Sequence, residues 1–122
     1  MIGAYYSKPD WHSQYFWWDK YATPNRNANY DIEKYDWRWN KFKEFTYNQL
    51  EELMTDYGSV DILWLDGGWV RPKETVNDEV RAWGAPIPDF SQEIDMPKIA
   101  AMAREKQPGI IFADRTVHGP YE

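Results

Sequence analysis

Three short apolar runs, at residues 2–7, 60–65 and 109–114, constrain the fold more than any other feature of the sequence. Each run is rich in β-branched, aromatic or other apolar residues and ends at a polar residue, as strands do. None shows clean alternation of apolar and polar residues. Because near-continuous apolar runs are typical of parallel strands covered on both faces, the sequence predicts three parallel strands.

Helical periodicity fills the intervals between these runs. From Trp39 to Tyr57, apolar residues recur at helical spacing. The face that they form is expected to comprise Phe42, Phe45, Leu50, Leu53, Met54 and Tyr57. Gly58 follows as a C-cap. A second helix is expected over residues 96–106, with Asp95 at the N-cap and Pro97 in the first turn. Its buried side is expected to consist of Ile99, Ala100 and Ala103.

Long segments follow the first two predicted strands, whereas the segments that lead back into strands are short. Residues 8–37 and 69–92 are rich in aromatic residues, Asn, Asp and Pro. Loops this long in a compact domain are usually functional or disordered, and aromatic residues this dense argue against disorder. Long loops at the carboxyl ends of parallel strands are characteristic of a (β/α)8 barrel. A whole barrel needs about 250 residues, so residues 1–122 are expected to be part of one barrel, truncated at both ends.

The composition restricts the partners of the chain. Aromatic residues make up 18% of the sequence, with 8 Trp and 9 Tyr, more than a small core needs; such residues suit surfaces that stack on sugars, bases or peptides. The net charge of -6 argues against a nucleic-acid partner. No apolar stretch approaches the length of a membrane span, and the absence of Cys excludes thiolate catalysis and Cys-ligated metal sites.

Three motif-bearing segments occur in order along the chain: GAYYSKPDWH at residues 3–12, YNQLEELMTDYGSVDILWLDGGW at 47–69 and FADRTVHGPYE at 112–122. Together they resemble the α-L-fucosidases of glycoside hydrolase family 29, in which a QL-x-EL helix leads through a Tyr-Gly turn into a strand ending W-x-D-G. The resemblance implies a (β/α)8-like barrel that removes terminal α-L-fucose from a fucosylated glycan with retention, without a cofactor. Two distant histidines outside any metal-binding pattern argue against a metal site.

Asp66 follows the last apolar residue of the middle strand and matches the catalytic nucleophile of the family. A retaining glycosidase needs this carboxylate about 5–5.5 Å from a second carboxyl group that acts as acid and then as base. Gly67 and Gly68 lack a Cβ atom and are expected to leave room for the substrate. The alternative is that Asp66 is a turn residue or a helix cap in the DGG sequence.

Arg115 and Tyr6 match two further active-site residues of the family, an arginine that contacts fucose and a tyrosine of the YYS motif. Because adjacent residues of a strand face opposite sides, Tyr5 is then expected to face away from the site. The alternatives are an ion pair between Arg115 and Asp114, and two tyrosines that serve only in packing.

Aromatic residues near the strand ends are candidates for the walls of a sugar site. Trp11 and His12 follow the first strand, where an indole can contact the methyl-bearing side of fucose and an imidazole can hydrogen-bond a hydroxyl; the alternative is packing within the loop. Trp69 is expected at the edge of the subsite. Trp64 is a candidate for sugar contact or for barrel packing, and His118 is expected to be a loop residue rather than a ligand.

The acid/base is a glutamate in the family, at a position that varies between subgroups. Glu122 is the candidate within the sequence, and the alternative lies beyond it. The pocket is therefore expected to be incomplete and the isolated chain inactive.

Two other functions stay open, a different retaining glycosidase on the same barrel and a non-catalytic carbohydrate-binding module, although most such modules are β-sandwiches. Because a partial barrel has unpaired strand edges, we also expect self-association.

Overall fold

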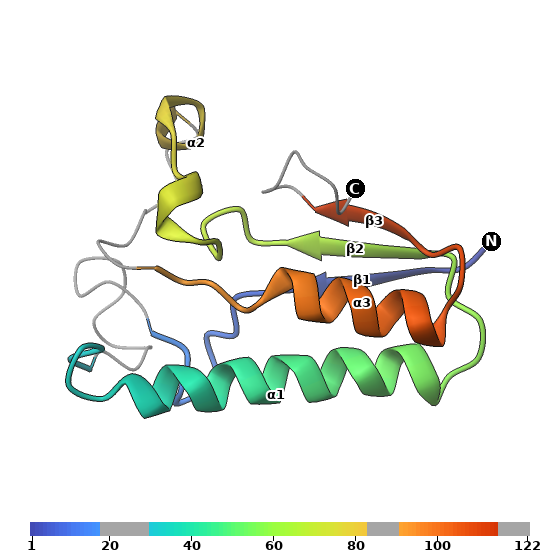
Figure 1. Ribbon diagram of the computed structural model, residues 1–122, viewed down its shortest axis with the longest axis horizontal. Helices are drawn as coiled ribbons and strands as arrows, with labels where there is room; N and C mark the ends of the chain where they lie inside the picture. Colours follow the sequence, from blue (N-terminus) through green and yellow to red (C-terminus); the bar gives the residue numbers. More distant parts are fainter. Residues whose placement is uncertain (18–29, 83–90, 115–122) are drawn as a thin grey trace.

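The computed structural model describes residues 1–17, 30–82 and 91–114 of the chain as a small α/β unit (Figure 1). Its elements are, in order, β1 (Gly3–Ser7), α1 (Asp36–Thr55), β2 (Ile62–Asp66), the 3-10 turn η1 (Lys73–Thr75), α2 (Asp78–Ala82), α3 (Met96–Lys106) and β3 (Ile111–Asp114). The three predicted strands and the two predicted helices are confirmed, with small shifts at their ends. The sequence did not indicate η1 and α2, because elements this short carry no periodic pattern.

The strands form a parallel sheet in the order β1-β2-β3, as the sequence predicted. Ser7 lies opposite Asp66, and Leu65 lies opposite Asp114. The three strands therefore end at the same edge of the sheet, and the long segments after β1 and β2 begin at that edge.

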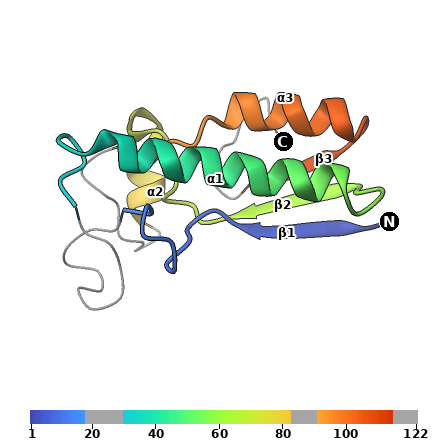
Figure 2. The same ribbon diagram turned by 90° about the horizontal axis from the view of Figure 1, so that it is seen from below.

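Both long helices, α1 and α3, cover the same face of this sheet (Figure 2). Side-chain burial alternates accordingly along the strands. Leu63 and Leu65 are fully buried against the helix layer, whereas Trp64 is 43% exposed on the opposite face. Tyr5, which lies opposite Trp64 in β1, is 64% exposed. We call this second face, formed by Tyr5, Ser7, Ile62, Trp64, Asp66 and Ile111, the open face.

A stripe of residues spaced three or four apart anchors α1 to the core. The stripe consists of Trp39, Phe42, Thr46, Leu50 and Met54. Phe45 and Tyr57, which were expected on the same face, are exposed. Phe45 lies about 100° around the helix from its buried neighbour Thr46, and Tyr57 follows the end of the helix. Gly58, expected as the C-cap, has a positive φ of 86° but lies beyond the observed C-cap, Asp56.

The start of α3 has the N-cap residue and the first-turn proline that the sequence predicted. The Asp95 carboxylate accepts a hydrogen bond from the backbone N–H of Lys98 at 3.3 Å, and Pro97 lies in the first turn. Asp95 itself has a positive φ of 62°, a conformation that costs free energy for a residue with a side chain. Its N–H donates to the Glu93 carboxylate at 2.7 Å, which helps to hold this conformation. The buried side of the helix includes the predicted residues Ile99, Ala100 and Ala103.

Hydrogen bonds join the segments that follow β1 and β2 to each other and to the helix layer. The Trp39 indole donates to the Glu93 carbonyl oxygen at 2.8 Å, and the Lys43 ammonium pairs with the Glu93 carboxylate at 2.5 Å. The side-chain amide of buried Gln92 donates to the carbonyl oxygen of Trp17 at 2.7 Å. The segment before α3 is thus fastened both to α1 and to the chain that follows β1.

The open face generates a prediction about association. Within the described residues, the outer edges of β1 and β3 pair with no strand, and the open face exposes large apolar side chains. We predict that the chain self-associates at micromolar concentration, since such edges and faces favour pairing. In sedimentation velocity, Ile111→Lys on the open face should lower the associated fraction, whereas Tyr57→Lys, a similarly exposed position after α1, should not. A clean wild-type monomer would contradict the prediction.

Candidate functional site

Asp66 is the last residue of β2 and lies at the edge of the sheet where the strands end. Because Leu65 is buried against the helices, the alternation of the strand directs Asp66 to the open face, two residues after Trp64. Its side chain is half-buried. The sheet therefore carries one carboxylate to the position expected for it, accessible from the open face.

Two donors hold the Asp66 carboxylate, one in β1 and one in the residue that follows β2. The Tyr5 hydroxyl donates to Oδ2 at 2.5 Å, and the backbone N–H of Gly67 donates to Oδ1 at 2.8 Å. Hydrogen bonds to a carboxylate are short and strong compared with those between neutral groups. Both oxygens are therefore fixed in orientation, so that the carboxylate is presented in one defined arrangement.

A glycine is required at position 67, because this residue packs closely against the segment that follows β1. Its φ is +99°, and an added Cβ atom would lie 2.3 Å from Cδ of Pro9. The backbone N–H of Lys8 also donates to the Asp66 carbonyl oxygen at 2.9 Å, which extends the pairing of the two strands by one bond. The expectation that Gly67 leaves room for a substrate is thus wrong, because Pro9 fills that space.

The tyrosine pair has the opposite orientation from the one expected. Tyr6 faces the helix layer, where its hydroxyl donates to Oε1 of Gln49 on α1 at 2.7 Å. Burial raises the pKa of Tyr6 to about 12. Tyr5, not Tyr6, shares the open face with Asp66. The orientation follows from the register between β1 and β2, which a single strand's sequence does not reveal.

Trp11 and His12 lie in a turn after β1 that the Asp10 carboxylate organises. This carboxylate accepts hydrogen bonds from the backbone N–H groups of His12 at 2.9 Å and Ser13 at 3.2 Å. Both Trp11 and His12 are exposed. They border a shallow cavity of about 450 Å³, whose lining comprises Tyr6, Ser7, Pro9, Asp10, Trp11, His12 and Gln49. Ser7, opposite Asp66 in the sheet, connects this cavity with the open face.

The remaining candidates differ in position. Trp64 lies on the open face with Asp66, whereas Trp69 is partly buried and packs against the hydrophobic core. Arg115 and Glu122, and likewise His118, lie outside the described residues. The described structure thus brings Asp66, Tyr5 and Trp64 together. Sequence reasoning missed Tyr5. The register between β1 and β2, had it been known, would have shown that Tyr5 lies on the same face of the sheet as Asp66.

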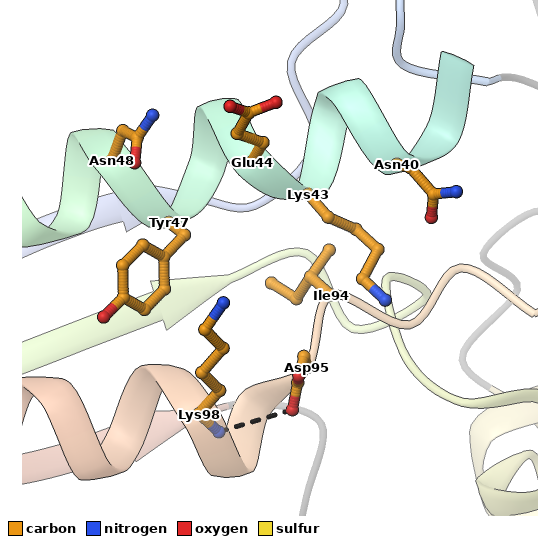
Figure 3. Close-up of a pocket in the computed structure, with 8 residues that line it drawn as sticks. All are labelled: Asn40, Lys43, Glu44, Tyr47, Asn48, Ile94, Asp95 and Lys98. Atoms are coloured by element: carbon orange, nitrogen blue, oxygen red, sulfur yellow. Dashed lines mark hydrogen bonds between the residues drawn. The ribbon is translucent and has the colours of Figure 1, made fainter. Parts of the chain in front are cut away.

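A second concavity lies between α1 and the start of α3 (Figure 3). This groove has a volume of about 380 Å³ and is lined by Asn40, Lys43, Glu44, Tyr47, Asn48, Ile94, Asp95 and Lys98. Lys43 is paired with Glu93 at 2.5 Å, and the Lys98 ammonium lies 4.6 Å from the centre of the Tyr47 ring. Because both helices cover the face opposite to Asp66, the groove is separate from the candidate site.

The described parts of the chain contain no cluster of three or more His, Cys, Asp or Glu side chains arranged to hold a metal ion. No helix in the same parts combines the length and the apolar character that crossing a membrane requires.

The packing of Gly67 against Pro9 predicts a difference between two glycine substitutions. Gly58 also has a positive φ, 86°, but an added Cβ atom there would meet nothing within 4 Å. Gly58→Ala should therefore cost only the backbone term of about 1 kcal/mol. Gly67→Ala should cost about 1 to 3 kcal/mol more, the range for overpacking. Urea unfolding measures both variants, and equal losses would show that Pro9 does not restrict position 67.

Buried tyrosines predict a loss of stability at alkaline pH. Burial raises the pKa values of Tyr6 and Tyr30 from 10.0 to about 12. The folded chain thus holds protons that the unfolded chain releases near pH 10. Stability should be complete below about pH 10 and fall as the pH rises toward 12. Urea unfolding between about pH 9 and pH 12 tests this. Tyr6→Phe should flatten the decline, and a decline that is unchanged in this variant would contradict the prediction.

Comparison with known proteins identifies the family to which the chain belongs. A family model described as α-L-fucosidase matches residues 1–122, the whole sequence. A search of curated proteins gives no match. The family match agrees with the resemblance carried by the three ordered segments. Together with the parallel sheet that carries Asp66 to its edge, it shows that the chain belongs to the α-L-fucosidase family, a family of glycoside hydrolases.

Proposed function

We propose that the chain carries the nucleophile strand of a retaining α-L-fucosidase that removes terminal fucose from a fucosylated glycan, with Asp66 as the nucleophile. One observation carries the proposal: Asp66 ends β2 on the open face, with both carboxylate oxygens held by Tyr5 and Gly67. A nucleophile benefits from such an arrangement, since orientation fixed before the reaction lowers the barrier.

In this mechanism the Asp66 carboxylate attacks the anomeric carbon of fucose. The bond from that carbon to the glycosidic oxygen breaks, and the departing oxygen takes a proton from the acid. Water, deprotonated by the same group, then displaces Asp66 and releases fucose with its configuration retained. Glu122 is the candidate for the acid/base within the sequence, and a glutamate beyond it is the alternative. Tyr5 keeps the carboxylate in place during the attack.

Other side chains are proposed to bind the sugar. Trp64 shares the open face with Asp66 and offers an apolar surface to the methyl-bearing side of fucose. Trp11 and His12 border the cavity that Ser7 connects with this face. Arg115 is proposed to contact fucose beside the nucleophile.

Two positions that the sequence also suggested are less direct candidates. Trp69 packs against the core and is proposed to shape the edge of the subsite. Tyr6 is turned toward Gln49, so its proposed contribution is to support the strand rather than to touch the sugar.

The open face is proposed to be part of the interior of a (β/α)8 barrel. Three adjacent parallel strands, helices on one face and long segments at one end are features of that architecture. A barrel needs about 250 residues, so the chain would form one sector of it. The parallel sheet also argues against a carbohydrate-binding module of the β-sandwich type, whose strands are antiparallel.

Substitution of Asp66 tests the nucleophile in the complete barrel protein encoded by the reading frame that contains these residues. With an aryl α-L-fucoside, Asp66→Ala should lose several orders of magnitude of kcat/KM, and azide should restore part of it by filling the vacated position. Asp61→Ala is the matched control: this carboxylate precedes the same strand and accepts from the backbone N–H of Ile2 at 2.7 Å. Undiminished activity in Asp66→Ala would remove this residue from the mechanism.

The isolated chain supplies a second test. If the pocket needs further strands and a second carboxyl group, residues 1–122 alone should not hydrolyse the aryl fucoside. Turnover by the isolated chain at a rate near that of the complete protein would refute the view that it is one sector of the catalytic barrel.

A further inference from the structure

Trp37 is a large apolar side chain that the fold holds but does not cover. It lies in the first turn of α1 and is 53% exposed. Tyr15 meets it edge-on, with ring centroids 6.4 Å apart. The Arg38 guanidinium lies 5.9 Å from the centre of the Trp37 ring and 4.7 Å from that of Tyr30. We call these four residues, Tyr15, Tyr30, Trp37 and Arg38, the Trp37 platform.

The surroundings fix the platform in place. One Arg38 nitrogen donates to the carbonyl oxygen of Gln14 at 3.1 Å, and the Tyr30 hydroxyl donates to the carbonyl oxygen of Tyr15 at 2.7 Å. The Arg38 bond ties the start of α1 to the segment after β1, and the Tyr30 bond joins two positions within that segment. An exposed ring that is already ordered loses little conformational entropy when a ligand stacks on it.

The platform lies at the same end of the molecule as Asp66. α1 extends beyond the ends of the strands at the edge where β2 terminates (Figure 1). However, α1 belongs to the helix layer (Figure 2), whereas the alternation along β2 directs Asp66 to the open face. A ligand on Trp37 would therefore be a part of the glycan distant from the bond that is cut, and not the fucose itself.

We propose that the Trp37 platform binds a neutral saccharide unit of the glycan that carries the fucose. The apolar C–H face of a sugar ring packs on an indole, and a guanidinium N–H donates to a hydroxyl. The exposed acidic residues that precede or begin this turn, Asp31, Glu33 and Asp36, outnumber the nearby cations Lys34 and Arg38, and the chain has a net charge of -6, so a neutral saccharide is favoured over an anionic one. The inference rests on the proposed function for the identity of the glycan.

Binding of lacto-N-neotetraose, a neutral tetrasaccharide without fucose, tests the platform in the 122-residue chain. In a ¹H–¹⁵N titration, the indole N–H resonance of Trp37, identified by its absence from Trp37→Phe, should shift with added saccharide. Trp37→Ala should weaken the affinity roughly five- to tenfold, the loss expected for one stacked ring. Tyr57→Ala is the matched control, since Tyr57 is 65% exposed but follows the opposite end of α1.

Several outcomes would overturn the proposal. These are a Trp37 resonance that does not move, a Trp37→Ala variant that binds as the wild type does, or an equal loss in Tyr57→Ala. The resonance shift is measured on the wild-type chain, so it decides the matter even if Trp37→Ala does not fold. The tetrasaccharide carries no fucose and the titration involves no cleavage, so failure of the nucleophile assignment and failure of the platform give different results.

Discussion

The parallel pairing of β1 with β2 is the constraint on which the candidate site depends. In the observed register Ser7 lies opposite Asp66 and Tyr5 opposite Trp64. Because side chains alternate along a strand, a shift of one residue would turn Tyr5 toward the helices and remove its hydrogen bond to Asp66. The burial of Leu63 and Leu65 under the helix layer opposes such a shift for β2. Hydrophobic packing on one face of the sheet therefore determines which polar groups meet on the other.

The segments that leave the sheet at the site are held at two levels. At the strand ends, Pro9 packs against Gly67, and the Lys8 N–H donates to the Asp66 carbonyl oxygen. Farther along, Gln92 bonds to the backbone of the segment after β1, and the Glu93 carboxylate connects α1 with the start of α3. The segments that surround the Asp66 carboxylate are thus fastened to one another.

The sequence was sufficient for the existence and the approximate extent of each strand and each long helix. The strands, α1 and α3 each carry their own pattern, and the direction of Asp66 follows from the burial of its neighbour Leu65. It was insufficient where two distant segments meet: the orientation of Tyr5 depends on the register between strands, and the role of Gly67 depends on Pro9. Phe45 was misplaced because it borders the buried stripe of α1.

Orientation and electrostatic surroundings are separate requirements for a carboxylate that we propose to act as a nucleophile. The hydrogen bonds from Tyr5 and Gly67 orient the Asp66 carboxylate. However, Tyr5 and Trp64 beside it are exposed, so solvent reaches this face. Water screens the charges that develop during glycosidic cleavage, whereas an enclosed site strengthens their interactions with fixed groups. We infer that closing the open face would serve catalysis by excluding water as well as by adding the second carboxyl group.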